Sequence, residues 1–436
     1  MAAQEVKKRG FMSWYFGTNL LLRILLGLGL GAVVGLFLAH SPEYAGGFIT
    51  YTKFFGDLFV RLLRMIVVPV IFFSLITGAA SITPHQLGRV GVKIMGYYLA
   101  TTAVAVCIAL ILGVVFQPGA GLGISGDAAA QAKVATMPPL SQVILAIVPT
   151  NPAESLTKGD VLPIIFFSLI FGIALSVLRD SKNEALAKNA TRLFDICSTV
   201  AETMYKIVGG VMEYAPVGVF VLIAVVFAQQ GPKVIGPLVF VTLLCYIGFV
   251  VHVVVTYGGV LTLFGLSFVK FLRGAWEASL TAFVTRSSNA TLPISLRVTE
   301  EELGAPRSIT SFSLPIGATV NMDGTAVYLA ICAIFIGNAV GAPLGFEQMV
   351  TLTLISTLAS IGAAGVPGAG AIMMLMVLEG VGLPVQAGSA VAAAYALILG
   401  IDALLDMGRT CLNVTGDLVG AVVVSKNEKT LDMSKW

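Results

Sequence analysis

Long runs of apolar residues, separated by short polar connections, dominate the chain. A helix that crosses a membrane needs about 20 consecutive, mostly apolar residues. Eight runs meet this length or come close to it, and the pattern therefore predicts eight transmembrane helices. They are 18–39, a run ending at 80, 92–116, a run interrupted at 149–159 and ending at 178, 193–228, a run from about 233 to 268, 312–340, and the run that starts near 391.

Two further segments are apolar but too irregular to span. Residues 275–298 are interrupted by the polar string TRSSNATLP (285–293), and both flanks carry the basic residues typical of one side of a membrane. Residues 356–371 read STLASIGAAGVPGAGA, where glycines allow close backbone approach and Pro367 prevents a continuous helix. We expect each segment to enter and leave on the same side as a re-entrant hairpin. A glycine-rich external loop is the alternative for the second.

The run Phe312–Val340 carries the string NMDGT (321–325) at its centre. An aspartate beside a glycine at this depth predicts local unwinding, as in transporters with discontinuous helices. Asn321, Asp323 and exposed carbonyl groups would form an oxygen-rich set, which suits an alkali or alkaline-earth cation.

The last apolar run contains Asp402, Asp406, Arg409, Asn413 and Asp417, spaced 4, 3, 4 and 4 residues apart. This spacing places all five on one stripe of an α-helix. Each charge costs about 2.5–3.5 kcal/mol at the centre of a membrane helix. An internal ion-pair network is the alternative, but one guanidinium cannot neutralise three carboxylates. The surplus negative charge indicates that cations bind from outside the chain.

Composition agrees with a polytopic membrane protein. The chain is 57% hydrophobic and 11% charged, against roughly 25% charged in soluble domains, and its mean hydropathy is +0.93. Five Cys and three His are isolated from one another, so a transition-metal site is not expected. We find no nucleotide-binding loop and no catalytic motif, and Ser287 and Ser288 lack a nearby base. An ion-coupled transporter or a channel remains, rather than an enzyme.

Basic residues predict the orientation. Outside connections hold only Lys133, Lys158 and Lys233, while the remaining basic loop residues fall on the opposite side. The positive-inside bias places both termini in the cytoplasm of a multi-pass protein of the cell (plasma or inner) membrane.

Four strings carry a family resemblance: TRSSNATLP (285–293), NMDGT (321–325), SIGAAGVPGAGA (360–371) and DMGRTCLNVTGD (406–417). In this order and spacing they resemble the signature regions of the glutamate/aspartate transporter family, the dicarboxylate/amino acid:cation symporters. The similarity is greatest to prokaryotic sodium-coupled aspartate transporters. It extends over essentially the whole chain, including PTNPAESLTKGDVLP and MYKIVGGVMEYAPVGVF.

The resemblance implies an all-α membrane protein with eight transmembrane helices, two re-entrant hairpins and inverted repeats. It further implies a homotrimer in which a transport domain moves as an elevator against a static scaffold. The expected division is 1–80 (scaffold helices 1 and 2), 84–117 (transport helix 3), 118–140 (external flexible loop), 141–232 (scaffold helices 4 and 5), 233–274 (transport helix 6), 275–300 (first hairpin), 306–342 (broken helix 7), 347–383 (second hairpin), 384–426 (helix 8) and 427–436 (cytoplasmic tail).

By the same resemblance, Arg409 pairs with the side-chain carboxylate of an acidic amino acid and Asp406 holds its ammonium group. Arginine suits this task because its guanidinium binds a carboxylate through two parallel hydrogen bonds. The other expected substrate-binding residues are Arg286, Ser287, Ser288, Thr325, Val366, Gly370, Thr410 and Asn413.

The resemblance also implies about three co-transported sodium ions. The first site would use Gly317, Asn321, Asn413 and Asp417, the second backbone at Thr319, Met322, Ser360, Ile361 and Ala363, and the third Tyr98, Thr101, Thr102, Asn321 and Asp323. Tyr98, Thr101 and Thr102 share one helix face, which fits the third site independently. Hydrogen bonds of these hydroxyl groups to their own helix are the alternative.

Two departures from the family pattern bear on specificity. Asn289 stands where members more often have Ser, and Ala363 where the most similar members have Thr. Asp417 together with Asp323 favours sodium as the coupling ion, and Asp406 favours an amino acid over a plain C4-dicarboxylate. Aspartate is favoured over glutamate. A proton-coupled glutamate or C4-dicarboxylate symporter is the alternative, and an anion channel is a more distant one.

Overall fold

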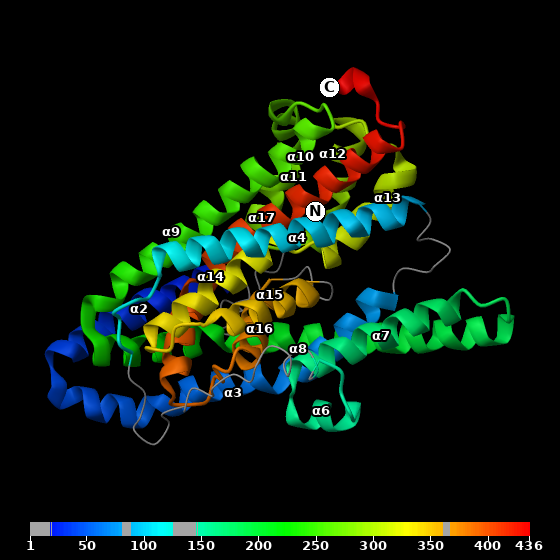
Figure 1. Ribbon diagram of the computed structural model, residues 1–436. Coiled ribbons are helices and arrows are strands. Elements are labelled where there is room, and N and C mark those ends of the chain that lie inside the picture. Colours follow the sequence, from blue (N-terminus) through cyan, green and yellow to red (C-terminus); the bar gives the residue numbers. More distant parts are fainter. Residues whose placement is uncertain (1–17, 19, 81–88, 125–144, 146, 361–366) are drawn as a thin grey trace, which may run out of the picture.

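A computed structural model describes residues 18, 20–80, 89–124, 145, 147–360 and 367–436. Over these residues the chain is nearly all helical and contains no strand (Figure 1). Six continuous helical stretches within them are long and apolar enough to cross a membrane, and two shorter apolar helices accompany them. The predicted all-α polytopic membrane fold is therefore confirmed, while the number of eight spans stays a prediction.

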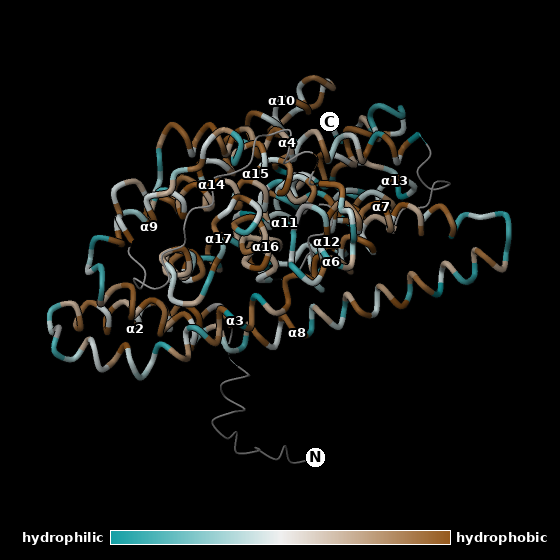
Figure 2. Tube along the Cα trace, turned by 60° about the horizontal axis from the view of Figure 1, so that its bottom comes forward, coloured by the Kyte–Doolittle hydropathy of each residue, from teal (hydrophilic) through white to brown (hydrophobic). Residues whose placement is uncertain are grey.

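One group of helices contains four long members and one short one. The long helices α2 (Leu20–His40), α3 (Pro42–Ala80), α7 (Val161–Arg179) and α8 (Glu184–Gln230) pack mainly on one another, and α6 (Pro152–Lys158) precedes α7. Helices α2, α3 and α8 lie side by side along the lower edge of Figures 1 and 2. Inside this group, Arg23 of α2 donates to Glu213 of α8 at 2.6 Å.

The second group holds the remaining long elements, packed around α17 and α14. Hydrophobic colouring extends along most of its helices (Figure 2). Its members are α4 (Arg89–Phe116), α9 (Ile235–Val251), the π-helical segment His252–Tyr257, α10 (Gly258–Leu263), α11 (Phe268–Thr285), α12 (Ser288–Glu301), α13 (Arg307–Val320), α14 (Asp323–Ala339), α15 (Phe346–Ser360), α16 (Ala369–Gly380) and α17 (Ala390–Asn427). Short 3₁₀ turns occupy Gly231–Val234 and Met433–Lys435.

Both predicted hairpins exist as helix pairs, α11–α12 and α15–α16. The first begins at Phe268, seven residues before the expected 275, because the preceding helix ends at Leu263 and Ser267 caps α11. Its two helices meet at Arg286, which adopts the left-handed conformation with φ of 55°. The tip of the second hairpin, 361–366, and most of the loop expected at 118–140 lie outside the described residues.

The C-terminal tail returns to the base of the first hairpin. The Asp432 amide donates to the Gly304 carbonyl at 2.9 Å, and the Trp436 indole donates to the Leu303 carbonyl at 2.9 Å. At the end of α17, Glu428 accepts from Lys93 of α4 at 2.5 Å, and this hydrogen bond lowers the pKa of the Glu428 carboxyl group.

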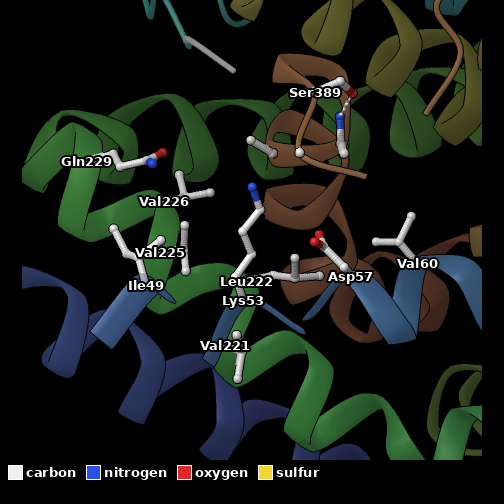
Figure 3. A pocket seen from close by; sticks show the side chains of 13 residues that line it. Ile49, Lys53, Asp57, Val60, Val221, Leu222, Val225, Val226, Gln229 and Ser389 are labelled. Carbon is white, nitrogen blue, oxygen red and sulfur yellow. Dashed lines mark hydrogen bonds between the residues drawn. The ribbon is translucent and has the colours of Figure 1, made fainter. Parts of the chain in front are cut away.

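Cavities lie along the boundary between the two helix groups. One of about 60 Å³ is enclosed by α3, α8 and the start of α17, with Lys53, Asp57 and Gln229 on its wall (Figure 3). Another of about 230 Å³ lies between α3, α6 and α16. Arg64 of α3 and Glu379 of α16 face each other there at 4.0 Å. Two cavities thus lie at the boundary between the groups.

Close helix packing in the first group depends on glycine. A Cβ at Gly218 of α8 would collide with the ring of Phe59 of α3, whereas one at Gly210 on the same helix would meet no atom within 4 Å. We expect Gly218→Ala to lower the stability of the purified protein, since overpacking costs about 1–3 kcal/mol. Gly210→Ala, the matched control, should be neutral or stabilising because alanine favours helix. Apparent melting temperatures in detergent distinguish the two, and equal values would contradict the packing argument.

Candidate functional site

Helix α17 runs without interruption through the polar stripe predicted from the sequence. All five stripe residues are buried. Asp402 is 4% exposed, and the other four are less exposed than that. Helices α11, α13 and α14 cover α17, so the stripe faces other helices of the second group. This location is the one expected of ionisable residues in a membrane protein, which face the bundle interior.

Arg409 is held by two carboxylates of its own helix. Its Nε and Nη2 atoms donate to Asp406 Oδ1 at 2.9 and 2.8 Å, and Nη1 lies 3.4 Å from Asp402 Oδ1. The guanidinium also lies over the ring of Tyr328, 4.8 Å from its centroid. Thr410 Oγ1 donates to Asp406 Oδ1 at 3.2 Å. Asp406 and Arg409, predicted to bind opposite charges of one substrate, therefore form a direct pair.

The second hairpin reaches this pair through its glycines. Gly368 has φ of 83°, which favours glycine, and its amide donates to Asp406 Oδ2 at 3.3 Å. Gly370 lies so close to the Arg409 guanidinium that an added Cβ would overlap it. The Tyr395 hydroxyl donates to the Ala371 carbonyl at 2.8 Å, which ties the hairpin to α17.

The broken helix opens where the sequence predicted. Helix α13 ends at Val320, Asn321 is extended with φ of −90° and ψ of 90°, and α14 starts at Asp323. The freed Gly324 amide donates to Asn413 Oδ1 at 2.7 Å. An added Cβ at Gly324 would collide with the Arg409 backbone. Glycine here allows α14 and α17 to approach closely at the site.

Oxygen-bearing groups gather behind the break, as expected for the first sodium site. Asn321 Nδ2 donates to Asp417 Oδ1 at 3.0 Å and to the Asn413 carbonyl at 3.2 Å. The Asp417 carboxylate and the Tyr98 hydroxyl both flank Gly317. Within the described part of the chain, the buried Asn321 Oδ1 atom has no hydrogen-bond partner. An unpaired oxygen beside a carboxylate fits a cation-binding position.

Asp323 forms a second cluster. Its Oδ1 atom accepts from Thr102 of α4 at 2.6 Å, as the predicted third sodium site requires. Its Oδ2 atom accepts from Tyr257 at 2.8 Å and lies 3.1 Å from His252 Nε2. Neither His252 nor Tyr257 is among the site residues predicted from the sequence, in which His252 stands isolated from other possible ligands. An ionisable residue inside a hydrophobic run was the available signal.

The structure also describes several other residues that were predicted to bind the substrate. Ser287 caps α12 by accepting from the Ala290 amide at 3.2 Å, Ser288 is buried beside it, and Arg286 is half-buried at the hairpin tip. The Thr325 hydroxyl accepts from Asn413 Nδ2 at 3.4 Å. Asn289 is exposed.

The second and third predicted ion sites are only partly described, and the second was predicted to use backbone groups. The hydroxyls of Thr101 and Thr319 donate to carbonyls of their own helices, Tyr98 and Ile316, at 3.1 and 3.0 Å. The Met322 sulfur contacts Asn413 Nδ2 at 3.0 Å. Three residues, Ile361, Ala363 and Val366, lie outside the described residues, as does the side chain of Ser360.

The donor set suits a hard monovalent cation. In the part of the chain that the structure describes, no three His, Cys, Asp or Glu residues are grouped to hold a metal ion. The cluster at Asp417 combines a carboxylate with amide, hydroxyl and carbonyl oxygens. The cluster at Asp323 combines a carboxylate with two hydroxyl groups and an imidazole nitrogen. Such oxygen sets favour alkali and alkaline-earth cations over zinc or copper.

Comparison with known proteins identifies the family. Residues 20–427 match the sequence model of the sodium:dicarboxylate symporter family. The chain belongs to this family. Its members are elevator-type transporters rather than enzymes, and the chain is accordingly a multi-pass membrane transporter.

Several relatives match along nearly their whole length. The proton/glutamate-aspartate symporter of Escherichia coli is 37% identical over 96% of this chain and 94% of its own. A proton/sodium-glutamate symport protein of Geobacillus stearothermophilus is 34% identical over 93% and 94%. A C4-dicarboxylate transport protein of Rhodopseudomonas palustris is 32% identical over 97% and 90%. The relatives thus differ in substrate and in coupling ion.

The contact between Gly370 and Arg409 gives a test of the site geometry. We expect Gly370→Ala to displace the guanidinium and to weaken binding of an acidic ligand by about tenfold or more, which corresponds to 1.4 kcal/mol. Gly345→Ala is the control, because its added Cβ would approach no atom closer than 3.7 Å. Calorimetric titration with aspartate measures both variants. Equal affinities would contradict the placement of Arg409 against the second hairpin.

Proposed function

We propose that this protein is a secondary active symporter that couples inward sodium movement to uptake of an acidic amino acid, with L-aspartate favoured and L-glutamate possible as substrate. The observation that carries the proposal is the buried pair of Asp406 and Arg409, closed by glycines of the second hairpin. Family membership supports acidic-solute symport.

The pair explains how a zwitterionic acid would be recognised. The guanidinium donates through Nε and Nη2 to one oxygen of Asp406, Oδ1. An incoming side-chain carboxylate competes for these donors and can bind them through both of its oxygens. Asp406 is thereby released for the ammonium group of the same molecule. A dicarboxylate without an ammonium group would leave Asp406 buried and unpaired, which is costly. The exchange favours an amino acid.

Charge supports cation coupling. Four carboxylates, those of Asp323, Asp402, Asp406 and Asp417, are buried. Among the described residues, Arg409 is the guanidinium that forms ion pairs with two of them, Asp402 and Asp406. Formally ionised, the four carboxylates and this guanidinium leave three negative charges, and an acidic amino acid adds one more. Three bound monovalent cations would offset most of this charge, in agreement with the number that the family resemblance implies.

Sodium is favoured over a proton because oxygen-bearing groups gather around Asp417 and contact Asp323. Gly317, Asn321, Asn413 and Tyr98 surround Asp417, and Thr102 contacts Asp323. Proton-coupled symport of glutamate or of a C4-dicarboxylate is the second candidate. Two relatives support this candidate: a proton/glutamate-aspartate symporter that is 37% identical to this chain and a C4-dicarboxylate transport protein that is 32% identical.

The two helix groups fit an elevator mechanism. The group of α2, α3, α7 and α8 would form the static scaffold of a homotrimer, and the second group, which holds every candidate ligand, would move. Cavities of about 60 and 230 Å³ at their boundary support relative sliding. The distribution of basic residues supports cytoplasmic termini in the cell membrane.

Removal of the guanidinium tests substrate recognition. We expect Arg409→Ala to lower aspartate uptake by proteoliposomes at least about a hundredfold, because a buried charge partner is lost. Arg61→Ala is the control, since Arg61 is exposed on α3 in the other helix group. If Arg409→Ala takes up aspartate at the rate of the wild-type protein, the substrate assignment is contradicted.

Removal of one carboxylate tests ion coupling. We expect Asp417→Asn to raise the half-saturating sodium concentration for uptake by about tenfold or more. Asp402→Asn removes the same charge from the same stripe but contacts Arg409, so it should alter substrate affinity more than sodium dependence. An unchanged sodium dependence in Asp417→Asn would count against Asp417 as a cation ligand.

Ligand titrations separate the two candidate functions. We expect purified protein to bind aspartate and glutamate in sodium, to bind succinate more weakly because it lacks an ammonium group, and to bind all three poorly in potassium. Calorimetry with each ligand in each salt provides the measurement. Equal affinity in sodium and potassium would rule out sodium coupling and favour the proton-coupled alternative.

A further inference from the structure

A π-helical segment, His252–Tyr257, interrupts the apolar helix between α9 and α10. Such turns are rare and are frequently found at functional sites. Both of its end residues are fully buried, with 0% exposed. His252 Nε2 and the Tyr257 hydroxyl approach the same oxygen, Asp323 Oδ2, at 3.1 and 2.8 Å. The two end residues of the π-helical segment therefore contact the same carboxylate oxygen of α14.

The wider turn is what allows this convergence. Residues five apart on a regular α-helix point about 140° away from each other, since each residue advances about 100°. A π turn pairs residue i with residue i+5 and brings both toward one face. A regular helix in this segment would direct either His252 or Tyr257 away from Asp323.

Thr256 contacts the other ring nitrogen of His252. Its Oγ1 atom lies 3.2 Å from His252 Nδ1. Helical threonines commonly donate back to their own backbone instead, as Thr242 does to the Leu238 carbonyl at 2.7 Å. A hydroxyl group that donates to Nδ1 leaves the imidazole proton on Nε2, where it can be donated to a carboxylate.

Asp323 is thus held from both sides. Thr102 of α4 donates to Oδ1 at 2.6 Å, while the π-helical segment donates to Oδ2. Asp323 itself has 0% exposure. Hydrogen bonds of this kind fix the orientation of a residue that binds a cation. Loss of such a partner typically weakens metal affinity by roughly 10–100-fold.

We propose that His252 and Thr256 are positioning residues for the cation site at Asp323. Thr256 sets the imidazole tautomer, and the Nε2–H group of His252 holds Oδ2 so that the carboxylate is already oriented when a cation arrives. Neither residue binds the ion or the substrate. This role rests on the proposed function, in which Asp323 is a sodium ligand.

The test measures sodium binding apart from transport. Sodium is titrated against the melting temperature of the purified full-length protein without substrate, because a ligand that binds the folded state stabilises it. Aspartate affinity is then measured at saturating sodium. The variants are His252→Met, which removes the donor, His252→Gln, which keeps one, and Thr256→Val. Thr242→Val is the matched control on the preceding turns.

We expect His252→Met to raise the half-saturating sodium concentration about tenfold or more, the lower bound for a lost supporting partner. His252→Gln should stay within about threefold of the parent, Thr256→Val should fall between them, and Thr242→Val should have no effect. Aspartate affinity at saturating sodium should change by less than about threefold in every variant. Rescue by glutamine separates positioning from a merely structural role.

A spectroscopic measurement keeps the proposal testable if neither His252 variant folds. The chain has only three His, so ¹⁵N-histidine solid-state NMR can resolve His252, which is identified by comparison with the Thr256→Val spectrum. We expect a proton on Nε2, and Thr256→Val should shift the Nδ1 resonance. A proton on Nδ1 alone would overturn the proposal.

Two outcomes distinguish this proposal from the function on which it rests. If Asp323→Asn shifts the sodium titration and His252→Met does not, the positioning role falls and the cation site stands. If Asp323→Asn leaves the titration unchanged, Asp323 is not a cation ligand, and both the site assignment and the positioning role fall.

Discussion

The excess of buried carboxylates over cationic side chains is the constraint on which the other features of this structure depend. Asp402, Asp406, Asp417 and Asp323 are each at most 4% exposed, and Arg409 pairs with two of them, Asp402 and Asp406. Uncompensated charges at this burial are expensive. The chain reduces the cost with hydrogen bonds from segments distant in sequence, to Asp417 and Asp323 from other helices and to Asp406 from the second hairpin.

Irregular backbone occurs where those donors are needed. Arg286 and Gly368 have positive φ at the two hairpins, Asn321 is extended between α13 and α14, and a π turn ends at Tyr257. Three of these places bring an amide or side-chain donor to a site residue: Gly368 to Asp406, Gly324 beside the break to Asn413, and Tyr257 to Asp323. Non-helical backbone at membrane depth survives where it is buried in protein, and this arrangement meets that condition.

Substrate and cation positions are connected through one residue. Asn413 accepts from Gly324 with its side chain, contacts Thr325 near Arg409, and offers its carbonyl to Asn321 beside Asp417. A change at the candidate substrate position would therefore reach the candidate ion cluster through a single helical turn of α17. Such a shared element is a physical basis for coupling, because both ligands would bias the same local arrangement.

Much of this site could be predicted from sequence, because its main determinants are local. Apolar run length indicated the helices, the 4, 3, 4, 4 spacing placed five polar residues on one face of α17, and the NMDG string indicated the break at Asn321. Local periodicity could not show that Arg409 pairs with Asp406 in preference to Asp402, that Thr101 bonds its own helix while Thr102 crosses to Asp323, or where the first hairpin begins. His252 and Tyr257 escaped notice because α-helical spacing assigns them to different faces. Only a π turn, stabilised by packing against a carboxylate more than sixty residues away, brings them together.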